Sequence, residues 1–246
     1  TKYGDKYDLN VELLWFGDNV CGSSSSAPDY VINDRKRFPY IGEVFSYASA
    51  DLLKRESNAL IQIMNYLYDN DLNRRVTAVQ ILNEANMSDV TVKQLDAFLS
   101  FINQLGLAVK NSPYSVVTRV NFAINESFLD PEKNPLPEQV LALEGIDAVG
   151  PDLYTEWITD YGAYANRFST GGMATNPAHI AEGPGQMYVY PKQVLYSFAC
   201  NAGYDTYELR LDGNQDCDFG IFRASENEWI PRDGTLKTQY RWTSGE

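Results

Sequence analysis

The stretch Val76–Leu107 reads VTAVQILNEANMSDVTVKQLDAFLSFINQLGL and holds one full copy of the pattern that decides the fold. Its first part, Val76–Leu82, is a nearly continuous apolar run that is typical of a buried strand. Its last part, Thr91–Leu107, carries apolar residues at helical spacing, and we interpret Gly106 as the end of that helix. A buried strand followed by an amphipathic helix is the building unit of parallel sheets.

The same alternation continues on both sides of this stretch. The expected strands are Leu9–Phe16, Val76–Leu82, Ser115–Phe122, Ile146–Val149, Ala178–Ala181 and Thr206–Leu211, and the expected helices are Ser49–Tyr68, Thr91–Leu107, Glu138–Leu143 and Lys192–Ala202. Six strands alternating with helices predict an α/β protein with a parallel sheet, either open and doubly wound or closed as a barrel. The chain has no GxGxxG or GxxxxGK[ST] motif, which favours a (β/α)₈ barrel.

The polar tail from Asp212 to Glu246 is expected to form a loop and a closing segment, so residues 1–246 are predicted to be one domain. Within this tail, the run Asp212–Asp218 lacks the spacing of an EF-hand calcium loop, and we interpret it as a solvated loop.

Composition excludes several classes of function. The net charge of −13 disfavours nucleic acid and anionic membrane surfaces as partners, and no apolar run approaches the roughly 20 residues of a membrane span. His179 is the only histidine, so a multi-histidine metal site is excluded, and we expect neither a metal nor a cofactor. The cysteines Cys21, Cys200 and Cys217 allow one disulfide or three thiols, and thiols are favoured. The oligomeric state stays open.

Aromatic residues make up 13% of the chain, and aromatic faces can stack on sugar rings or fill a core. Trp15, Trp157 and Trp229 are each open to either role. Trp157 is the strongest candidate for a sugar contact because it follows the Ile146–Val149 strand on the expected functional side.

Two glutamates come directly after apolar strands. Glu84 follows Val76–Leu82, and Glu182 follows Ala178–Ala181. In a parallel barrel the active site lies at the carboxyl ends of the strands, so both carboxylates are expected at its mouth. Taken singly, Glu84 is equally compatible with capping a helix, and Glu182 with a turn before Gly183.

As a pair, the two glutamates match the requirement of glycosidic bond cleavage. One protonated carboxyl donates a proton to the leaving oxygen, and the second, ionised, attacks the anomeric carbon. A separation of about 5 to 5.5 Å between the carboxyl groups gives retention of configuration, whereas a wider gap admits water and gives inversion.

Two further charged residues, Glu12 and Arg119, fall inside expected strands. Since an unpaired buried charge is costly, we expect them to form an ion pair within the barrel, in a structural role.

Three segments give the chain a resemblance to a known family. Residues 11–39 (VELLWFGDNVCGSSSSAPDYVINDRKRFP) resemble the third-strand region of bacterial family-35-type β-galactosidases and their gut-bacterial relatives, within the clan A (β/α)₈-barrel glycoside hydrolases. Residues 78–87 (AVQILNEANM) are similar to the end of their fourth strand, and residues 179–185 (HIAEGPG) to their seventh. The similarity extends from about Tyr7 to Trp242.

The resemblance implies a role for each candidate residue. Glu84 would be the acid/base, Glu182 the nucleophile, and Asn83 would bind the hydroxyl beside the scissile bond. Tyr154, the last residue of the segment AVGPDLY, would donate a hydrogen bond to the nucleophile. Trp157 and Trp15 complete the expected carbohydrate-binding residues.

The resemblance also numbers the strands. The glutamates lie three strands apart here, as strands four and seven do in the family, so the visible strands would be three to eight and strands one and two would be missing. The expected function is a retaining β-glycosidase, β-galactosidase-like by the resemblance, with an extracytoplasmic location by resemblance alone. The alternative is a catalytically silent barrel that binds carbohydrate or serves as an assembly subunit.

Overall fold

The computed structural model describes residues 2–21, 23–24, 27–88, 90–123, 135–152, 179–184, 195, 203–207, 222–225 and 228–231. The chain divides into two compact units, Thr1–Gly150 and Pro151–Glu246, and each is described by itself.

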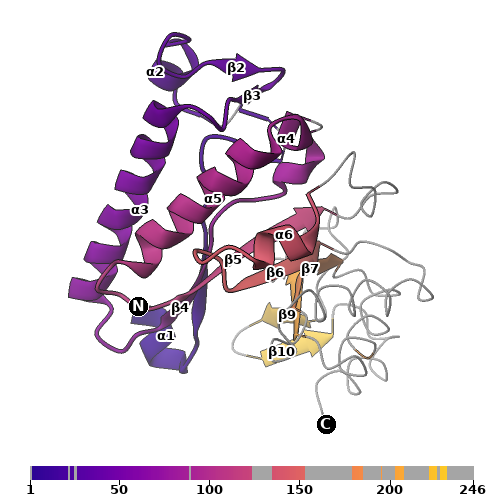
Figure 1. Ribbon diagram of the computed structural model, residues 1–246. Helices are drawn as coiled ribbons and strands as arrows, with labels where there is room; N and C mark the ends of the chain where they lie inside the picture. Colours follow the sequence, from indigo (N-terminus) through magenta and orange to yellow (C-terminus); the bar gives the residue numbers. More distant parts are fainter. Residues whose placement is uncertain are drawn as a thin grey trace. The chain divides into compact units, whose positions relative to one another are not determined.

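Parallel strands form the centre of the first unit (Figure 1). These strands are β1 (Val11–Leu14), β4 (Val76–Gln80), β5 (Val117–Ala123) and β6 (Ala148–Asp152), which crosses the boundary between the units. Their order in the sheet is their order in the chain, with Leu14 opposite Gln80 and Gln80 opposite Arg119. Parallel neighbours need a crossover between them, and helices supply it here.

Helix α3 (Ala50–Asn70) connects β1 to β4, and α5 (Leu95–Lys110) connects β4 to β5. The two helices lie side by side (Figure 1). Ser49 caps α3, because its hydroxyl oxygen accepts the N–H of Leu52 at 3.2 Å. The short α6 (Pro137–Leu141) precedes β6. The α/β alternation predicted from apolar spacing is confirmed in this unit.

The predicted helix Thr91–Leu107 differs from the observed one at both ends. It is divided at Gln94 into α4 (Val90–Lys93) and α5, and α5 continues past Gly106 to Lys110. The interpretation of Gly106 as a helix end is therefore wrong. A Cβ on Gly106 would lie 2.0 Å from the carbonyl oxygen of Gly145, so glycine is required here for close approach of the backbone, not for termination.

Several short elements were not expected from the sequence. They are α1 (Lys2–Tyr7), α2 (Asp29–Ile32), the 3-10 helix η1 (Ala85–Met87), and the antiparallel pair β2 (Tyr40–Ile41) and β3 (Val44–Phe45). The β2–β3 pair is held by aromatic packing, with the rings of Tyr40 and Phe45 4.3 Å apart between centroids.

The second unit contains the parallel strands β7 (His179–Pro184) and β8 (Gly203–Tyr207). Asp152, at the end of β6, is paired with Glu182 of β7. The six predicted strands are thus present among the described residues, with β7 longer than Ala178–Ala181 and β8 earlier than Thr206–Leu211. The tail also holds an antiparallel pair that was not predicted, β9 (Phe222–Ser225) and β10 (Glu228–Pro231). Of the predicted helix Lys192–Ala202, only Leu195 is described, and it is helical.

Among the described helices, none combines the length and the apolar character needed to cross a membrane.

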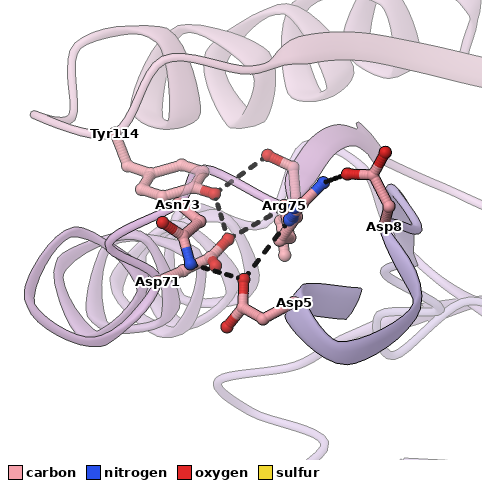
Figure 2. A network of polar contacts seen from close by, with 7 residues as sticks. Asp5, Asp8, Asp71, Asn73, Arg75 and Tyr114 are labelled. Carbon is pink, nitrogen blue, oxygen red and sulfur yellow. Dashed lines mark hydrogen bonds and ion pairs between the residues drawn. The ribbon is translucent and has the colours of Figure 1, made fainter. Parts of the chain in front are cut away.

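A polar cluster forms at the amino end of β4 (Figure 2). Asp71, directly after α3, accepts hydrogen bonds from the hydroxyl of Tyr114 at 2.5 Å and the N–H of Val76 at 2.8 Å. Burial alone would raise the pKa of Asp71, but the pKa is lowered to about 2, and the hydrogen bond from Tyr114 is the largest of the lowering contributions. The cluster therefore anchors the entry into β4 with an ionised, satisfied carboxylate.

The same cluster attaches α1 to the loop before β4. Asp5 accepts a hydrogen bond from the side-chain amide of Asn73 at 2.7 Å, and Arg75 forms ion pairs with Asp5 at 3.3 Å and Asp8 at 2.7 Å (Figure 2). Since Asp8 is largely exposed, its ion pair with Arg75 adds little to the stability of this cluster. The buried contacts of Asp71 contribute most of that stability.

Tyr114→Phe is predicted to lower the free energy of unfolding by about 1.5–3 kcal/mol at neutral pH, because it removes a hydrogen bond to a buried charge. Since the pKa of Asp71 lies below that of a free carboxyl, this loss shrinks as the pH falls from about 4 toward about 2. Urea denaturation measures it, with Tyr66→Phe, at an exposed tyrosine, as the control. Equal stability of the two variants would contradict the prediction.

Candidate active site

Glu84 lies just past the carboxyl end of β4, as predicted. The buried Ile81 and Leu82 follow the strand, and the chain then turns at Glu84, whose φ of 45° is in the left-handed region. This conformation is uncommon for a residue with a Cβ, and such residues cluster at functional sites. The N–H of Glu84 donates to the side-chain oxygen of Asn121 at 3.0 Å, and its carbonyl accepts the N–H of Met87 at 3.0 Å. The backbone at Glu84 is therefore held from both sides.

Asn83 is buried, and its amide connects three parts of the first unit. Its Oδ1 accepts hydrogen bonds from Gln80 at 2.8 Å and from Asn121 of β5 at 3.0 Å. Its Nδ2 donates to the sulfur of Cys21 at 3.2 Å. The ends of β4 and β5 and the loop after β1 are thus joined at one side chain.

Cys21 completes this group, and its contribution was missed at the sequence level. Its thiol donates to Oε2 of Glu84 at 3.2 Å, and its backbone N–H donates to the carbonyl of Asn83 at 3.1 Å. The signal available in the sequence was its place in the Ser/Gly loop after the first strand, since loops at that end of a parallel sheet carry functional residues.

Trp15 follows β1 at the same end of the sheet. Its backbone N–H donates to the carbonyl of Gln80 at 2.9 Å, and its indole N–H donates to Oε2 of Glu56 at 3.0 Å. The side chain is half-buried. The polar edge of the ring is thus directed at α3, and stacking of its face on a sugar stays a prediction.

Glu56 of α3 is fully buried and was also missed at the sequence level. Its two oxygens accept the indole N–H of Trp15 and the backbone N–H of Asp18, each at 3.0 Å. Burial raises the pKa of Glu56 to about 7, although these two donors oppose the rise. The available signal was its position between Leu52 and Leu60, in the apolar stripe of the helix.

The turn between Trp15 and Asp18 is shaped around this carboxyl group. Gly17 has a φ of 67°, and a Cβ there would lie 2.6 Å from Oε2 of Glu56. Asp18, nearly fully buried, forms an ion pair with Arg55 at 2.5 Å. Glu56 and Arg55 therefore set the path of the chain as it leaves β1.

The predicted ion pair between Glu12 and Arg119 is confirmed, with the guanidinium Nε donating to Oε1 of Glu12. Arg119 is buried, and Asn121 lies two residues further on the same side of β5. A row of polar side chains therefore runs along one face of these strands toward Glu84.

The second glutamate, Glu182, lies in the carboxyl half of β7, two residues before the strand ends at Pro184. The strand thus continues past the end expected for it. The position of the Glu182 side chain lies outside the described structure, as do Tyr154 and Trp157. Glu84 belongs to the first unit and Glu182 to the second, and each is described within its own unit.

No group of three or more histidine, cysteine or acidic side chains capable of holding a metal ion gathers within the part of the chain that the structure describes. Of the three cysteines, Cys21 is present as a thiol, and Cys200 and Cys217 lie outside the described residues.

Solved structures similar to this chain are glycoside hydrolases. A β-galactosidase from Rahnella sp. R3 superposes with a TM-score of 0.58 at 12% identity, covering 83% of this chain and 41% of that one. A GH10 protein from Paenibacillus barcinonensis gives 0.56 at 16% identity, covering 94% and 73%. The exo-β-1,4-mannosidase Op5Man5 from Opitutaceae bacterium strain TAV5 gives 0.52 at 9% identity, covering 85% and 45%.

These likenesses show the fold alone, which is an α/β fold with a parallel sheet like that of these hydrolases. The chain spans less than half the length of the β-galactosidase and of the mannosidase. Residues 98–231, more than half of the chain, match a family described as a domain of unknown function (DUF4978), and the chain belongs to that family. No curated protein matches it in sequence.

Glu56→Gln is predicted to flatten the pH dependence of folding stability. Since the folded protein binds the Glu56 proton more tightly than the unfolded chain, the stability from this group is complete below about pH 4.5 and is lost as the pH rises through about 7. At about 1.4 kcal/mol per pKa unit, this loss amounts to about 3 kcal/mol. Denaturant unfolding at about pH 5 and about pH 8 measures it. The exposed Glu43→Gln is the control and should keep the wild-type profile. An unchanged profile in Glu56→Gln would refute this assignment.

Proposed function

We propose that the chain carries the catalytic residues of a retaining glycoside hydrolase, with Glu84 as acid/base and Glu182 as nucleophile. The observation that carries the proposal is that each glutamate lies at or just past the carboxyl end of a parallel strand in its own unit. Glu84 lies four residues past the end of β4, Glu182 lies near the end of β7, and β7 is the third strand after β4 in sheet order. In a parallel barrel, groups at this end of the strands face the active site.

The surroundings of Glu84 support a chemical role. Glu84 has a left-handed backbone conformation and a half-buried side chain. Its backbone N–H donates to Asn121, and its carboxylate accepts from the thiol of Cys21. Strain sustained by surrounding hydrogen bonds is characteristic of active-site residues. The fold of the clan A glycoside hydrolases adds support, although fold alone does not determine activity.

The proposed reaction proceeds in two displacements. The carboxylate of Glu182 attacks the anomeric carbon and forms a glycosyl ester, while the bond to the leaving oxygen breaks and Glu84 gives that oxygen its proton. Glu84, now ionised, takes a proton from water, and the resulting hydroxide attacks the anomeric carbon and releases Glu182. The protein returns to its starting state, and no oxidant or metal takes part.

The substrate in this proposal is a β-linked carbohydrate. By the family resemblance, a β-galactoside is the first candidate, Asn83 binds the hydroxyl beside the scissile bond, and Tyr154 orients Glu182. Trp157 and Trp15 would stack on sugar faces. An extracytoplasmic location belongs to the same proposal and rests on the resemblance alone.

Glu84→Gln and Glu182→Gln are each predicted to lower kcat for an aryl β-glycoside by several orders of magnitude, because the acid/base alone contributes about 10²–10⁴-fold. Hydrolysis of a panel of 4-nitrophenyl glycosides at about pH 5 to 7 measures the effect, and NMR of the first-formed anomer tests retention.

Glu43→Gln, at an exposed position in the turn between β2 and β3, is the control for the loss of one negative charge. Full activity in either Glu84→Gln or Glu182→Gln would overturn the proposal. Sugar binding by the wild-type chain without any hydrolysis would favour the catalytically silent barrel instead.

A further inference from the structure

The thiol of Cys21 contacts both residues after β4 to which the proposed function assigns chemistry, Asn83 and Glu84. Its sulfur lies 3.2 Å from Oε2 of Glu84 and 3.2 Å from Nδ2 of Asn83. A thiol can donate one hydrogen bond and accept others. Because Asn83 has only N–H groups to offer at Nδ2, the sulfur accepts there, and its own S–H is directed at the carboxylate of Glu84.

The backbone, and not a free loop, sets this position. Cys21 has a φ of 49°, and its N–H is bonded to the carbonyl of Asn83 at 3.1 Å. On either side, Val20 and Ser23 exchange both backbone hydrogen bonds, at 2.7 and 2.8 Å. The tight turn that results places the sulfur of the exposed Cys21 beside Glu84.

We propose that Cys21 is a positioning residue for Glu84, holding Oε2 so that Oε1 carries the proton given to the leaving oxygen. This inference rests on the function proposed above. An oxygen that accepts the S–H is the poorer site for a second hydrogen, so the acidic proton resides on the other oxygen. The thiol is neither oxidised nor alkylated in the cycle. Its contribution is to choose which oxygen of the carboxyl group faces the substrate.

Two substitutions separate this role from simple packing. Cys21→Ser keeps a donor and an acceptor at the same Cβ, whereas Cys21→Ala removes both, and all three residues carry the same backbone cost at a positive φ. Similar unfolding midpoints of the two variants would show that the comparison is between folded proteins.

The decisive readout is the dependence of kcat/KM on the leaving group. A 2,4-dinitrophenyl glycoside needs little proton donation, whereas the phenyl glycoside of the same sugar depends on it. We expect Cys21→Ala to lower kcat/KM about 5–10-fold for the phenyl glycoside, in line with one lost hydrogen bond of about 1 kcal/mol, and less than about twofold for the dinitrophenyl glycoside. Cys21→Ser should recover most of the loss.

Equal losses for both substrates, or no loss in Cys21→Ala, would overturn the positioning role while leaving the glycosidase function intact. A wild-type chain without hydrolysis overturns the glycosidase function instead. In that case the contact itself is tested by alkylation of Cys21 with iodoacetamide, followed by peptide mass spectrometry.

A neighbouring carboxylate disfavours the thiolate that reacts, so Glu84→Gln should speed alkylation of Cys21 several-fold, with Glu43→Gln unchanged. Equal alkylation rates in wild type and Glu84→Gln would refute the contact.

Discussion

The arrangement at the carboxyl ends of β4 and β5 depends on the buried amide of Asn83. A polar side chain shielded from water needs partners for its donors and acceptors, and Asn83 finds them in Gln80, Asn121 and Cys21. Each partner comes from a different part of the first unit, so satisfying one amide joins two strands and a distant loop. The left-handed turn at Glu84 follows, because Asn121, fixed by the same amide, also accepts its N–H.

The two ends of the strands in the first unit carry different kinds of polar contact. At the amino end of β4, Asp71 is ionised and its Oδ2 accepts hydrogen bonds from both Tyr114 (Figure 2) and the backbone of Val76, which belong to the framework. At the carboxyl end, Glu84 is half-buried and keeps one oxygen, Oε1, outside its contact with Cys21. The first arrangement favours stability and the second leaves an acid able to react, which is the usual division in parallel α/β folds.

Glu56 shows how the framework at the carboxyl end is supported from outside the sheet. Its carboxyl group, buried in α3, holds Trp15 and the turn at Asp18 by hydrogen bonds. Because Gly17 has no Cβ, the turn after β1 can approach the carboxyl group of Glu56 closely. The loop that delivers Cys21 begins directly after this turn, and its placement therefore depends on a residue of the helix.

The sequence by itself determined the features that depend on local spacing. Apolar periodicity located α3 and α5, the apolar runs located six strands, and the cost of a buried charge predicted the pairing of Glu12 with Arg119. The position of Glu84 after a strand could also be predicted from the sequence, because this prediction requires only that the end of the strand be located.

Only the tertiary structure decided which partners meet. Gly106 ends no helix because the backbone of Gly145 is brought against it, and Glu56 is buried because the turn after β1 supplies its donors. The contact of Cys21 with Glu84 joins residues 63 positions apart. Local spacing fixes which face of an element is buried, but it carries no information about what lies opposite that face. What lies opposite each face depends on the path of the whole chain, and these long-range contacts determine the chemistry of this site.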